Sequence, residues 1–275
     1  DDDGHGQKNI KIKATIHIQG KHVHVDFTGT SDQVTGNINC PLSVTAAAVY
    51  YCFYALMPAN TPPCIGSFRS IDITAPKSSL VNASAPAAVA AGNVETSSRI
   101  VDVVLGALAK AIPDKIAAAS QGTMNNVAMG SYDWNYYETL AGGTGAHCFS
   151  NGCDAMQSHM TNTANTPIEI LEMYYPLRVR EYSIRSGSGG NGKHLGGNGL
   201  IREYEFLEQT SVSLLTERRT TRPWGISEGE PGLTGENILN GEYLPAKINF
   251  QAKMSDKLCI KTPGGGGWGS KTSIA

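Results

Sequence analysis

A run of polar side chains between Gly142 and Glu172 holds the densest collection of potentially reactive groups in the sequence. It combines histidines, carboxylates, amides and hydroxyls with few apolar residues between them, and is therefore too polar for an ordinary hydrophobic core. Histidines and carboxylates suit general acid–base catalysis, and amides and hydroxyls can orient a substrate. The predicted catalytic residues are His147, Asp154 and His159, and the predicted substrate-binding residues are Asn162, Thr163, Asn165 and Glu169. A solvent loop that only caps the element beginning near Pro167 is the alternative.

Two glycine-rich segments have the composition of ligand-binding loops. Gly187–Lys193 fits the pattern GxxxxGK, in which backbone amides and a lysine bind phosphates. That motif also needs Ser or Thr next and then a helix, but His194 and further glycines follow here. We therefore predict a structural loop between strands. Thr262–Gly269 contains four consecutive glycines, and either closes over a site or a partner surface or forms a tight terminal turn.

The remaining histidines and cysteines form no convincing metal site or disulfide framework. His22 and His24 alternate on one predicted strand, with His17 on its neighbour, but an exposed polar sheet face has the same pattern. We predict that this chain binds no metal. The six cysteines include no CxxC pair, which favours thiols in a reducing, cytoplasmic compartment. Cys148 and Cys153 have no neighbour that marks an activated nucleophile.

The overall composition excludes several functional classes. Hydrophobic residues make up 40% and charged residues 17% of the 275 residues, which is enough apolar material for one large domain or two ordinary ones. A net charge of −2 provides no basic surface for nucleic acid or an anionic membrane. No apolar stretch reaches the roughly 18 residues of a transmembrane helix. The start at Asp1, without methionine or signal peptide, indicates the middle of a longer chain, an expression boundary or a processed end.

Hydrophobic periodicity predicts the elements that must position the polar run. Alternation over residues 10–18 and 23–27 predicts a β-hairpin that turns at Gly20. Two helices are expected, Ser43–Met57 with Ser43 as its N-cap and Ser97–Ile112 capped by Thr96 or Ser97. Prolines should end both helices. Strands are expected at Arg69–Ala75, Leu177–Ile184, Leu200–Phe206, Ser211–Thr216, Ala246–Phe250 and Lys257–Lys261.

These elements predict an α+β fold. A mixed α/β N-terminal region would contain the hairpin and the central helices. A mostly antiparallel β region with glycine-rich turns would follow it. We place the two regions at residues 1–170 and 171–275, because strand patterns dominate after about Tyr174.

The polar run, together with many shorter motifs in order along nearly the whole chain, resembles the hydantoinase B family. The similarity lies in Tyr137–Thr139 just before the run, and in Gly142–Ala146, Met160–Thr163 and Asn165–Glu172 within it. Upstream it is carried by Asp26–Ser31, Asn39–Pro41, Gly92–Thr96 and Ala119–Asn126. Downstream it continues through Tyr175–Val179, Gly187–Lys193, Gly196–Gly199, Arg202–Glu203, Pro223–Gly225 and Thr262–Gly269.

The resemblance implies an enzyme that works only as part of a complex. Family members open cyclic amides such as hydantoins, 5-oxoproline or lactams at the expense of ATP, and relatives carboxylate acetone or acetophenone. In the family, ATP is bound by a hydantoinase A-type partner, and a divalent metal by the N-terminal half of the B-type subunit. This chain resembles the C-terminal half of that subunit, so it is expected to bind neither by itself. The expected partners are that A-type subunit, that N-terminal half and a small cyclic amide or ketone, without nucleic acid or membrane.

Three functions remain open from the sequence. The first is part of an ATP-dependent cyclic amidohydrolase, the second is part of an ATP-dependent ketone carboxylase, and the third is a non-catalytic scaffold. An unstrained amide carbonyl is a poor electrophile, so phosphorylation of its oxygen would prepare it for attack by water. Both enzymatic routes need a water-excluding cavity lined by fixed polar groups. The stretch from His147 to Glu172 is the predicted lining.

Overall fold

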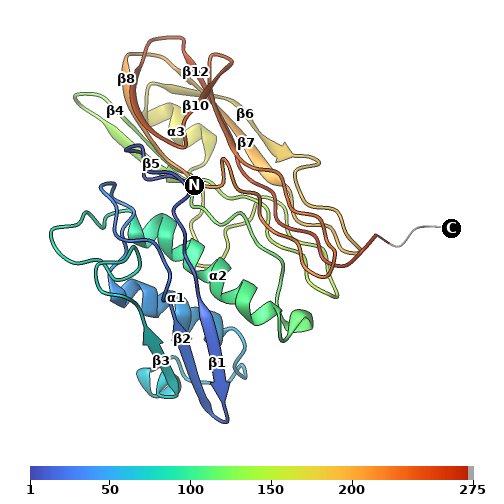
Figure 1. Cartoon of the computed structure of the whole chain (residues 1–275). Helices are drawn as coiled ribbons and strands as arrows, with labels where there is room; N and C mark the ends of the chain where they lie inside the picture. The colour runs from blue at the N-terminus through green and yellow to red at the C-terminus, as the bar shows by residue number, and fades with distance from the viewer. Residues whose placement is uncertain (272–275) are drawn as a thin grey trace. The chain divides into compact units, whose positions relative to one another are not determined.

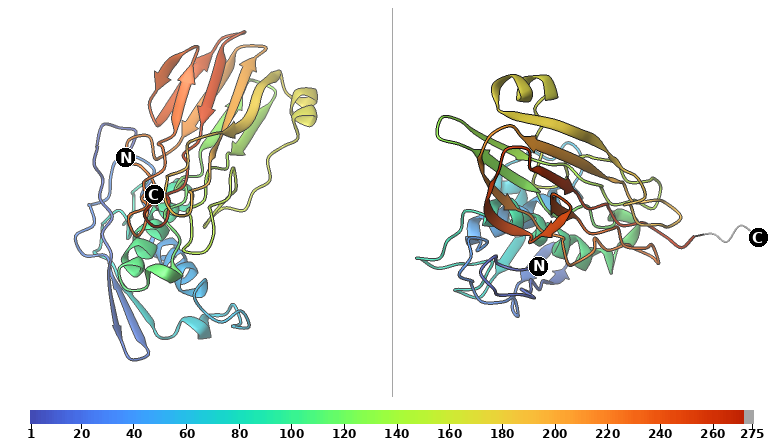
Figure 2. Two further views of the ribbon diagram at one scale, coloured as in Figure 1. Left: turned by 90° about the vertical axis from the view of Figure 1, so that its right-hand side faces the viewer. Right: turned by 90° about the horizontal axis from the view of Figure 1, so that it is seen from above.

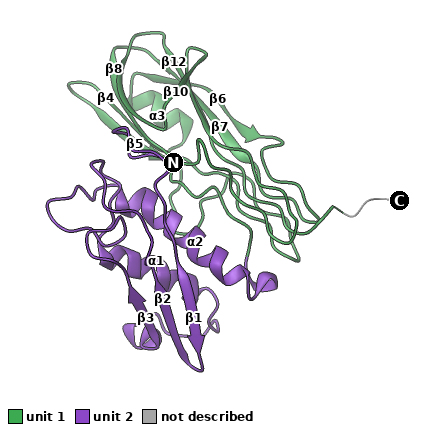
Figure 3. Ribbon diagram, viewed as in Figure 1, with its two compact units in different colours: residues 1, 117–275 green, residues 2–116 purple. Residues whose placement is uncertain are grey.

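The computed structural model describes residues 1–271 and confirms the α+β class. The chain forms two compact units, one of residues 2–116 and one of residue 1 with residues 117–275 (Figure 3). The division at Ile116 lies upstream of residue 170, where the sequence-based division was placed because strand patterns dominate after about Tyr174. Strand β4 precedes that change, yet it pairs with β8, which follows it. No helix among the described residues is long and apolar enough to cross a membrane.

The smaller unit contains the predicted hairpin and both predicted helices (Figure 1). Strands β1 (Thr15–Gln19) and β2 (His22–Asp26) are antiparallel, and β3 (Ile71–Thr74) runs parallel to β2. Gly20 has φ +60°, which explains the glycine in the turn. Helix α1 (Leu42–Tyr54) packs on α2 (Ser97–Ala109). Short helical turns are η1 (Ile65–Phe68), η2 (Gly92–Thr96) and η3 (Pro113–Lys115).

Of the predicted N-caps, Ser43 was wrong, while Thr96 holds the N-cap position of α2 without capping it by its side chain. Pro41 occupies the N-cap position of α1, so Ser43 lies inside the helix. Helix α2 continues directly from the π-helical turn η2, and Thr96 therefore already has helical dihedral angles, φ −64° and ψ −35°. Its hydroxyl donates to the carbonyl of Ile38 instead of capping the helix. The buried stripe of α2 that includes Ile100, Val104 and Leu108 agrees with the predicted periodicity.

The larger unit is built around two sheets that share one core. The four-stranded sheet has the order β11-β8-β4-β5, and the five-stranded sheet has the order β10-β9-β12-β7-β6. Their bounds are β4 Asn126–Gly130, β5 Asn135–Thr139, β6 Leu177–Arg185, β7 Gly199–Phe206, β8 Thr210–Leu215, β9 Glu236–Leu239, β10 Glu242–Leu244, β11 Lys247–Ala252 and β12 Lys257–Lys261. The alternation of β7 turns Leu200, Arg202, Tyr204 and Phe206 inward. Helix α3 (Ile168–Tyr174) packs on β6, as Figure 2 shows in yellow.

The glycine-rich segments run side by side as extended chains beyond the sheets of this unit (Figure 1). Backbone hydrogen bonds join them, for example from Gly190 to Gly265 and from Gly265 to Gly197. A Cβ built at Gly143 would lie 1.9 Å from the carbonyl oxygen of Gly197. One built at Gly265 would lie 2.0 Å from that of Thr144, so only glycine allows this packing. Gly264–Gly267 are buried and extended, so this block is not the tight terminal turn that was one of the two alternatives, and a role next to a site or a partner surface stays a prediction.

Candidate active site

The first part of the polar run forms a hairpin of extended chain, Gly142–Met156. Its two arms are joined by backbone hydrogen bonds from Met156 to Gly142 (2.8 Å), from Thr144 to Cys153 (3.0 Å) and from His147 to Ser150 (2.9 Å). His147 therefore lies at the tip, where its ring stacks on Phe149 with centroids 5.2 Å apart. Burial lowers the pKa of His147, so its imidazole is neutral at pH 7 and able to accept a proton.

Asp154 lies on the returning arm of this hairpin. Its side chain is exposed, but Oδ1 accepts a hydrogen bond of 2.6 Å from the backbone amide of Asn198. The carboxylate thus joins the hairpin to the strand-like segment before β7. This contact gives Asp154 a visible structural role, while its predicted catalytic role stays a prediction.

The second part of the run forms a loop, Ser158–Ala164, that we call the polar loop. Both of its ends are fastened to the same residue of β5, because the side-chain amides of Gln157 and Asn165 both donate to the Thr139 carbonyl, at 3.3 and 2.9 Å. His159 lies in the loop with φ +59°, a left-handed conformation that is uncommon for histidine. Asn162 and Thr163 are exposed at the far side of the loop.

The two predicted catalytic histidines follow opposite ends of the hairpin. The bridge between Gly142 and Met156 and the bridge between His147 and Ser150 mark these two ends. The extended chain from Gly142 to His147 spans roughly 15 Å. His159 follows the end opposite to His147, so the hairpin itself does not bring the two side chains together. Glu169 is exposed in the first turn of α3.

A buried cluster that the sequence analysis missed lies next to the polar loop. It consists of Glu138 from β5 and Arg202 and Tyr204 from β7, which face each other between the two sheets. Tyr204 donates to Glu138 Oε2 at 2.6 Å, and Arg202 Nη2 lies 3.8 Å from the same oxygen. The side chains of Arg202 and Glu138 are 0% and 4% exposed. Among the described residues, Nη1 and Nη2 of Arg202 have no hydrogen-bond partner.

Electrostatics fix the protonation states in this cluster. Burial raises the pKa of Tyr204 well above its usual value, and the neighbouring Glu138 carboxylate adds to the shift, so the phenol keeps its proton. Burial opposes the charge on Arg202, but Tyr204 and Glu138 outweigh it and raise the pKa of the guanidinium. The cluster therefore contains a fixed donor, a fixed cation and an acceptor.

The cluster makes direct contacts with the chain that follows the polar loop. Glu138 Oε1 accepts a hydrogen bond of 3.1 Å from the backbone amide of Thr166. Tyr182 of β6 places its ring 4.2 Å over the Arg202 guanidinium and donates its hydroxyl to Asn165 Oδ1 at 3.0 Å. Strand alternation could have signalled the cluster, since Glu138 and Arg202 occupy the same inward register as Tyr136 and Tyr204.

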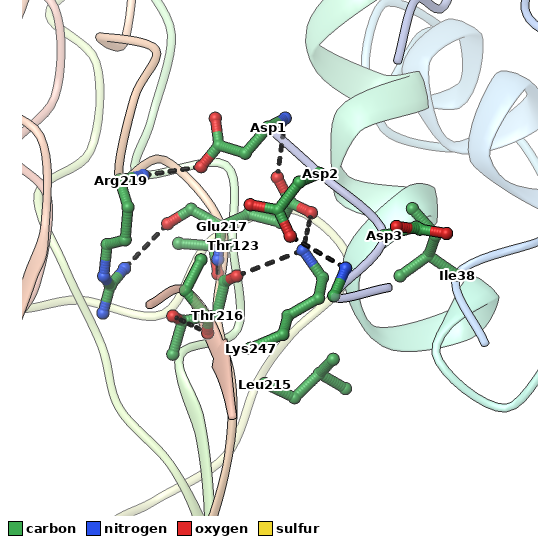
Figure 4. A network of polar contacts seen from close by, with 12 residues as sticks. Asp1, Asp2, Asp3, Ile38, Thr123, Leu215, Thr216, Glu217, Arg219 and Lys247 are labelled. Atoms are coloured by element: carbon green, nitrogen blue, oxygen red, sulfur yellow. Dashed lines mark hydrogen bonds and ion pairs between the residues drawn. The ribbon is translucent and has the colours of Figure 1, made fainter. Parts of the chain in front are cut away.

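A second polar network in the larger unit fastens the segment after β8 (Figure 4). The guanidinium of Arg219 donates to Asn125 at 2.8 Å and to Asn237 at 2.7 Å. Glu217 pairs with Lys247, and its backbone amide donates to Thr123 at 3.0 Å. Because these groups come from chain segments far apart in sequence, the network braces the segment Gly122–Asn126 against the sheets.

The glycine-rich loop and the histidines of β1 and β2 make other contacts within the fold. The backbone amide of Gly189 donates to Asn198, and those of Gly190 and Lys193 donate to Gly265 and Gly269, so they cannot cradle a phosphate. No group of three potential metal ligands occurs within residues 1–271. His24 instead hydrogen-bonds Thr74 at 2.8 Å and stacks on His17. No disulfide joins any of the six cysteines.

Comparison with known proteins places this architecture in a family. The model of the hydantoinase B/oxoprolinase family matches residues 1–271. The chain therefore belongs to the hydantoinase B/oxoprolinase family, as its motifs indicated. It is 42% identical to a 5-oxoprolinase of Dictyostelium discoideum over 278 residues, which cover 99% of this chain and 21% of the relative. It is 43% identical to 5-oxoprolinase 1 of Arabidopsis thaliana, over 95% of this chain and 20% of that relative.

Two solved structures establish the same fold in larger proteins. The ATP-dependent caprolactamase of Pseudomonas jessenii has a TM-score of 0.85 at 24% identity, with 98% of this chain and 50% of that chain covered. A nucleotide-free acetone carboxylase has a TM-score of 0.78 at 16% identity, and the match covers 93% of this chain and 41% of that chain. The chain thus spans about a fifth of the length of the two 5-oxoprolinases and half or less of these structures.

Proposed function

We propose that this chain supplies part of the active site of an ATP-dependent cyclic amidohydrolase that opens 5-oxoproline, a hydantoin or a lactam. The observation that carries the proposal is the identity of 42–43% to two 5-oxoprolinases over almost the whole chain. ATP would be bound outside this chain, by an A-type component, because the backbone amides of Gly189, Gly190 and Lys193 in the glycine-rich loop already donate to partners within the fold. The metal would be held by the N-terminal half of the B-type subunit.

The contribution of this chain would be to bind the cyclic amide and to handle protons. ATP supplies the phosphoryl group that activates the amide oxygen. The polar loop would place His159 as the general base for water, with Asn162 and Thr163 holding the ring substituents. His147 is the alternative base, since burial already keeps its imidazole neutral. Asp154 would contribute to catalysis by holding the hairpin in place through its bond to Asn198. Glu169 would bind the substrate from the first turn of α3.

The decisive experiment uses the full-length protein purified with the chains that accompany it. Ring opening and ADP release are measured with 5-oxoproline, hydantoin and caprolactam, and fixation of labelled bicarbonate is measured with acetone and acetophenone. We expect ATP-dependent opening of at least one cyclic amide and no bicarbonate fixation. Bicarbonate fixation into a ketone would replace the proposal by a carboxylase. Activity that persists when this part of the protein is deleted would identify a scaffold.

Substitution then separates the two histidines. His159→Ala and His147→Ala are compared for kcat and for thermal unfolding in the same preparation. Loss of a general base is expected to lower turnover about 100-fold or more while melting is retained. If only His147→Ala has this effect, the base lies at the hairpin tip, and the polar loop has no catalytic group.

A further inference from the structure

The contacts around Asn165 suggest a task other than binding substrate. Its side-chain amide has two distinct ends, and both have partners within the fold. Nδ2 donates to the Thr139 carbonyl at 2.9 Å, and Oδ1 accepts from the Tyr182 hydroxyl at 3.0 Å. A side chain held at both ends is fixed in place, and only one N–H and one lone pair of the amide remain beyond these two bonds.

Tyr182 connects this fixed point to the buried cluster. Its ring covers the Arg202 guanidinium at 4.2 Å, and Arg202 is in turn held by Tyr204 and Glu138. Glu138 also accepts the backbone amide of Thr166, the residue directly after Asn165. The chain leaving the polar loop is therefore fastened at two consecutive residues, both connected to one buried charge pair.

The other end of the loop is fastened to the same place. Gln157 Nε2 donates to both the carbonyl and the hydroxyl of Thr139, each at 3.3 Å. The seven residues between these two anchors include His159 in its left-handed conformation and the exposed Asn162. Such a conformation is maintained only where the surrounding contacts determine it. The anchors at both ends are contacts that restrict this conformation.

We propose that Tyr182 and Asn165 are positioning residues that fasten the polar loop to the buried Glu138–Arg202 pair and thereby hold His159 for reaction. The catalytic half of this inference rests on the proposed function. Its structural half does not, because the anchoring contacts lie within the larger unit whatever reaction it serves.

The structural half is tested by amide hydrogen exchange on the full-length protein. Tyr182→Phe removes one hydroxyl and keeps the ring over Arg202, so the fold is retained. Asn165→Ala removes both side-chain contacts. Loss of one neutral hydrogen bond should speed exchange in peptides covering Ser158–Ala164 about threefold to tenfold, and Asn165→Ala should exceed this. Peptides of β7 should be unchanged. The control Tyr132→Phe alters a fully exposed tyrosine of the same unit and should leave the loop unchanged.

The catalytic half is tested by a double-mutant cycle. Tyr182→Phe should lower kcat about threefold to tenfold, the same factor as for amide exchange, without a change in KM or in the melting temperature. In a His159→Gln background, the second substitution should have almost no further effect, because both act through the same side chain. Equal losses in both backgrounds would overturn the positioning of His159. Unchanged exchange in the polar loop would overturn the anchoring itself. An enzyme that opens no cyclic amide but shows the exchange result would refute the proposed function and leave the anchoring intact.

Discussion

The buried Glu138–Arg202 pair makes a quantitative prediction about stability. Glu138→Gln preserves the shape of the side chain but removes its charge, which leaves the Arg202 guanidinium buried without a counterion. Two unit charges 3.8 Å apart attract each other by about 4 kcal/mol at an effective dielectric constant of about 20. Removing one partner of a buried ion pair typically costs about 3–5 kcal/mol. Arg202 belongs at the upper end of this range, because Nη1 and Nη2 have no hydrogen bonds among the described residues.

Thermal unfolding of the full-length protein provides the assay. A loss of about 3–5 kcal/mol from a unit of this size should lower Tm by roughly 6–20 °C. Arg202→Met should have a comparable effect, since it leaves the Glu138 carboxylate buried. The double variant Glu138→Gln/Arg202→Met should recover much of the loss, because an apolar replacement of both charges removes the desolvation cost as well.

The matched control is another arginine of the same sheet. Arg180 in β6 contacts Glu205 at 2.6 Å, but its side chain is 43% exposed. Arg180→Met should cost at most about 1 kcal/mol, as is usual for surface pairs. If Glu138→Gln costs no more than Arg180→Met, or if the two substitutions in the cluster are additive, the pair does not hold the sheets in the way argued above.

The other predictions concern separate parts of the chain. Burial lowers the pKa of His147, so the unfolded chain binds more protons than the folded one below about pH 6.5. The stability that His147 contributes is therefore present above that pH and is lost as the pH falls. The decline in Tm between pH 7 and pH 5 should be smaller in His147→Gln than in the unsubstituted protein. Gly265→Ala places Cβ 2.0 Å from a backbone oxygen and should cost about 3 kcal/mol, whereas Gly66→Ala, with its nearest atom at 3.6 Å, should be nearly neutral in the same unfolding experiment. Lys193→Ala should change the ATP affinity of the complete enzyme by less than about threefold, since the loop lacks the features of a phosphate site; a loss of about a hundredfold in a binding titration would refute this.

Local patterns predicted the elements, and non-local contacts determined what the sequence did not reveal. The hairpin of β1 and β2 and the strands β6, β7, β8, β11 and β12 follow from alternation and turn residues. The short strands β9 and β10 lack a run long enough to predict. Alternation marks Glu138 and Arg202 as inward-facing within their own strands. The two residues are 64 positions apart, so their pairing depends on how the two sheets stack, which alternation within one strand does not show.

The extended conformation of the glycine segments could not be predicted from the sequence, because glycines show no alternation of apolar and polar side chains. Each glycine is needed where another backbone passes within van der Waals distance, so composition signals a turn while the chain is extended. The fold also assigns their amides. Gly143, Gly190, Gly197 and Gly265 all donate to backbone carbonyls. These amides therefore cannot stabilise an oxyanion, despite the resemblance of such segments to catalytic loops.

The hydrogen bonds made by the glycine amides bear on which groups of this chain could contact a substrate. Because the amides of Gly143, Gly190, Gly197 and Gly265 donate within the fold, the proposed contribution to a substrate comes from side chains at the hairpin tip and in the polar loop. Asp154 and Asn165 already have structural partners, whereas Asn162 and Thr163 are exposed. A loop that presents such groups needs a rigid support, because a displacement of about 1 Å can cost a factor of a hundred in rate. Under the proposed function, the buried Glu138–Arg202 pair, to which the end of the loop is fastened, would be a rigid support of this kind.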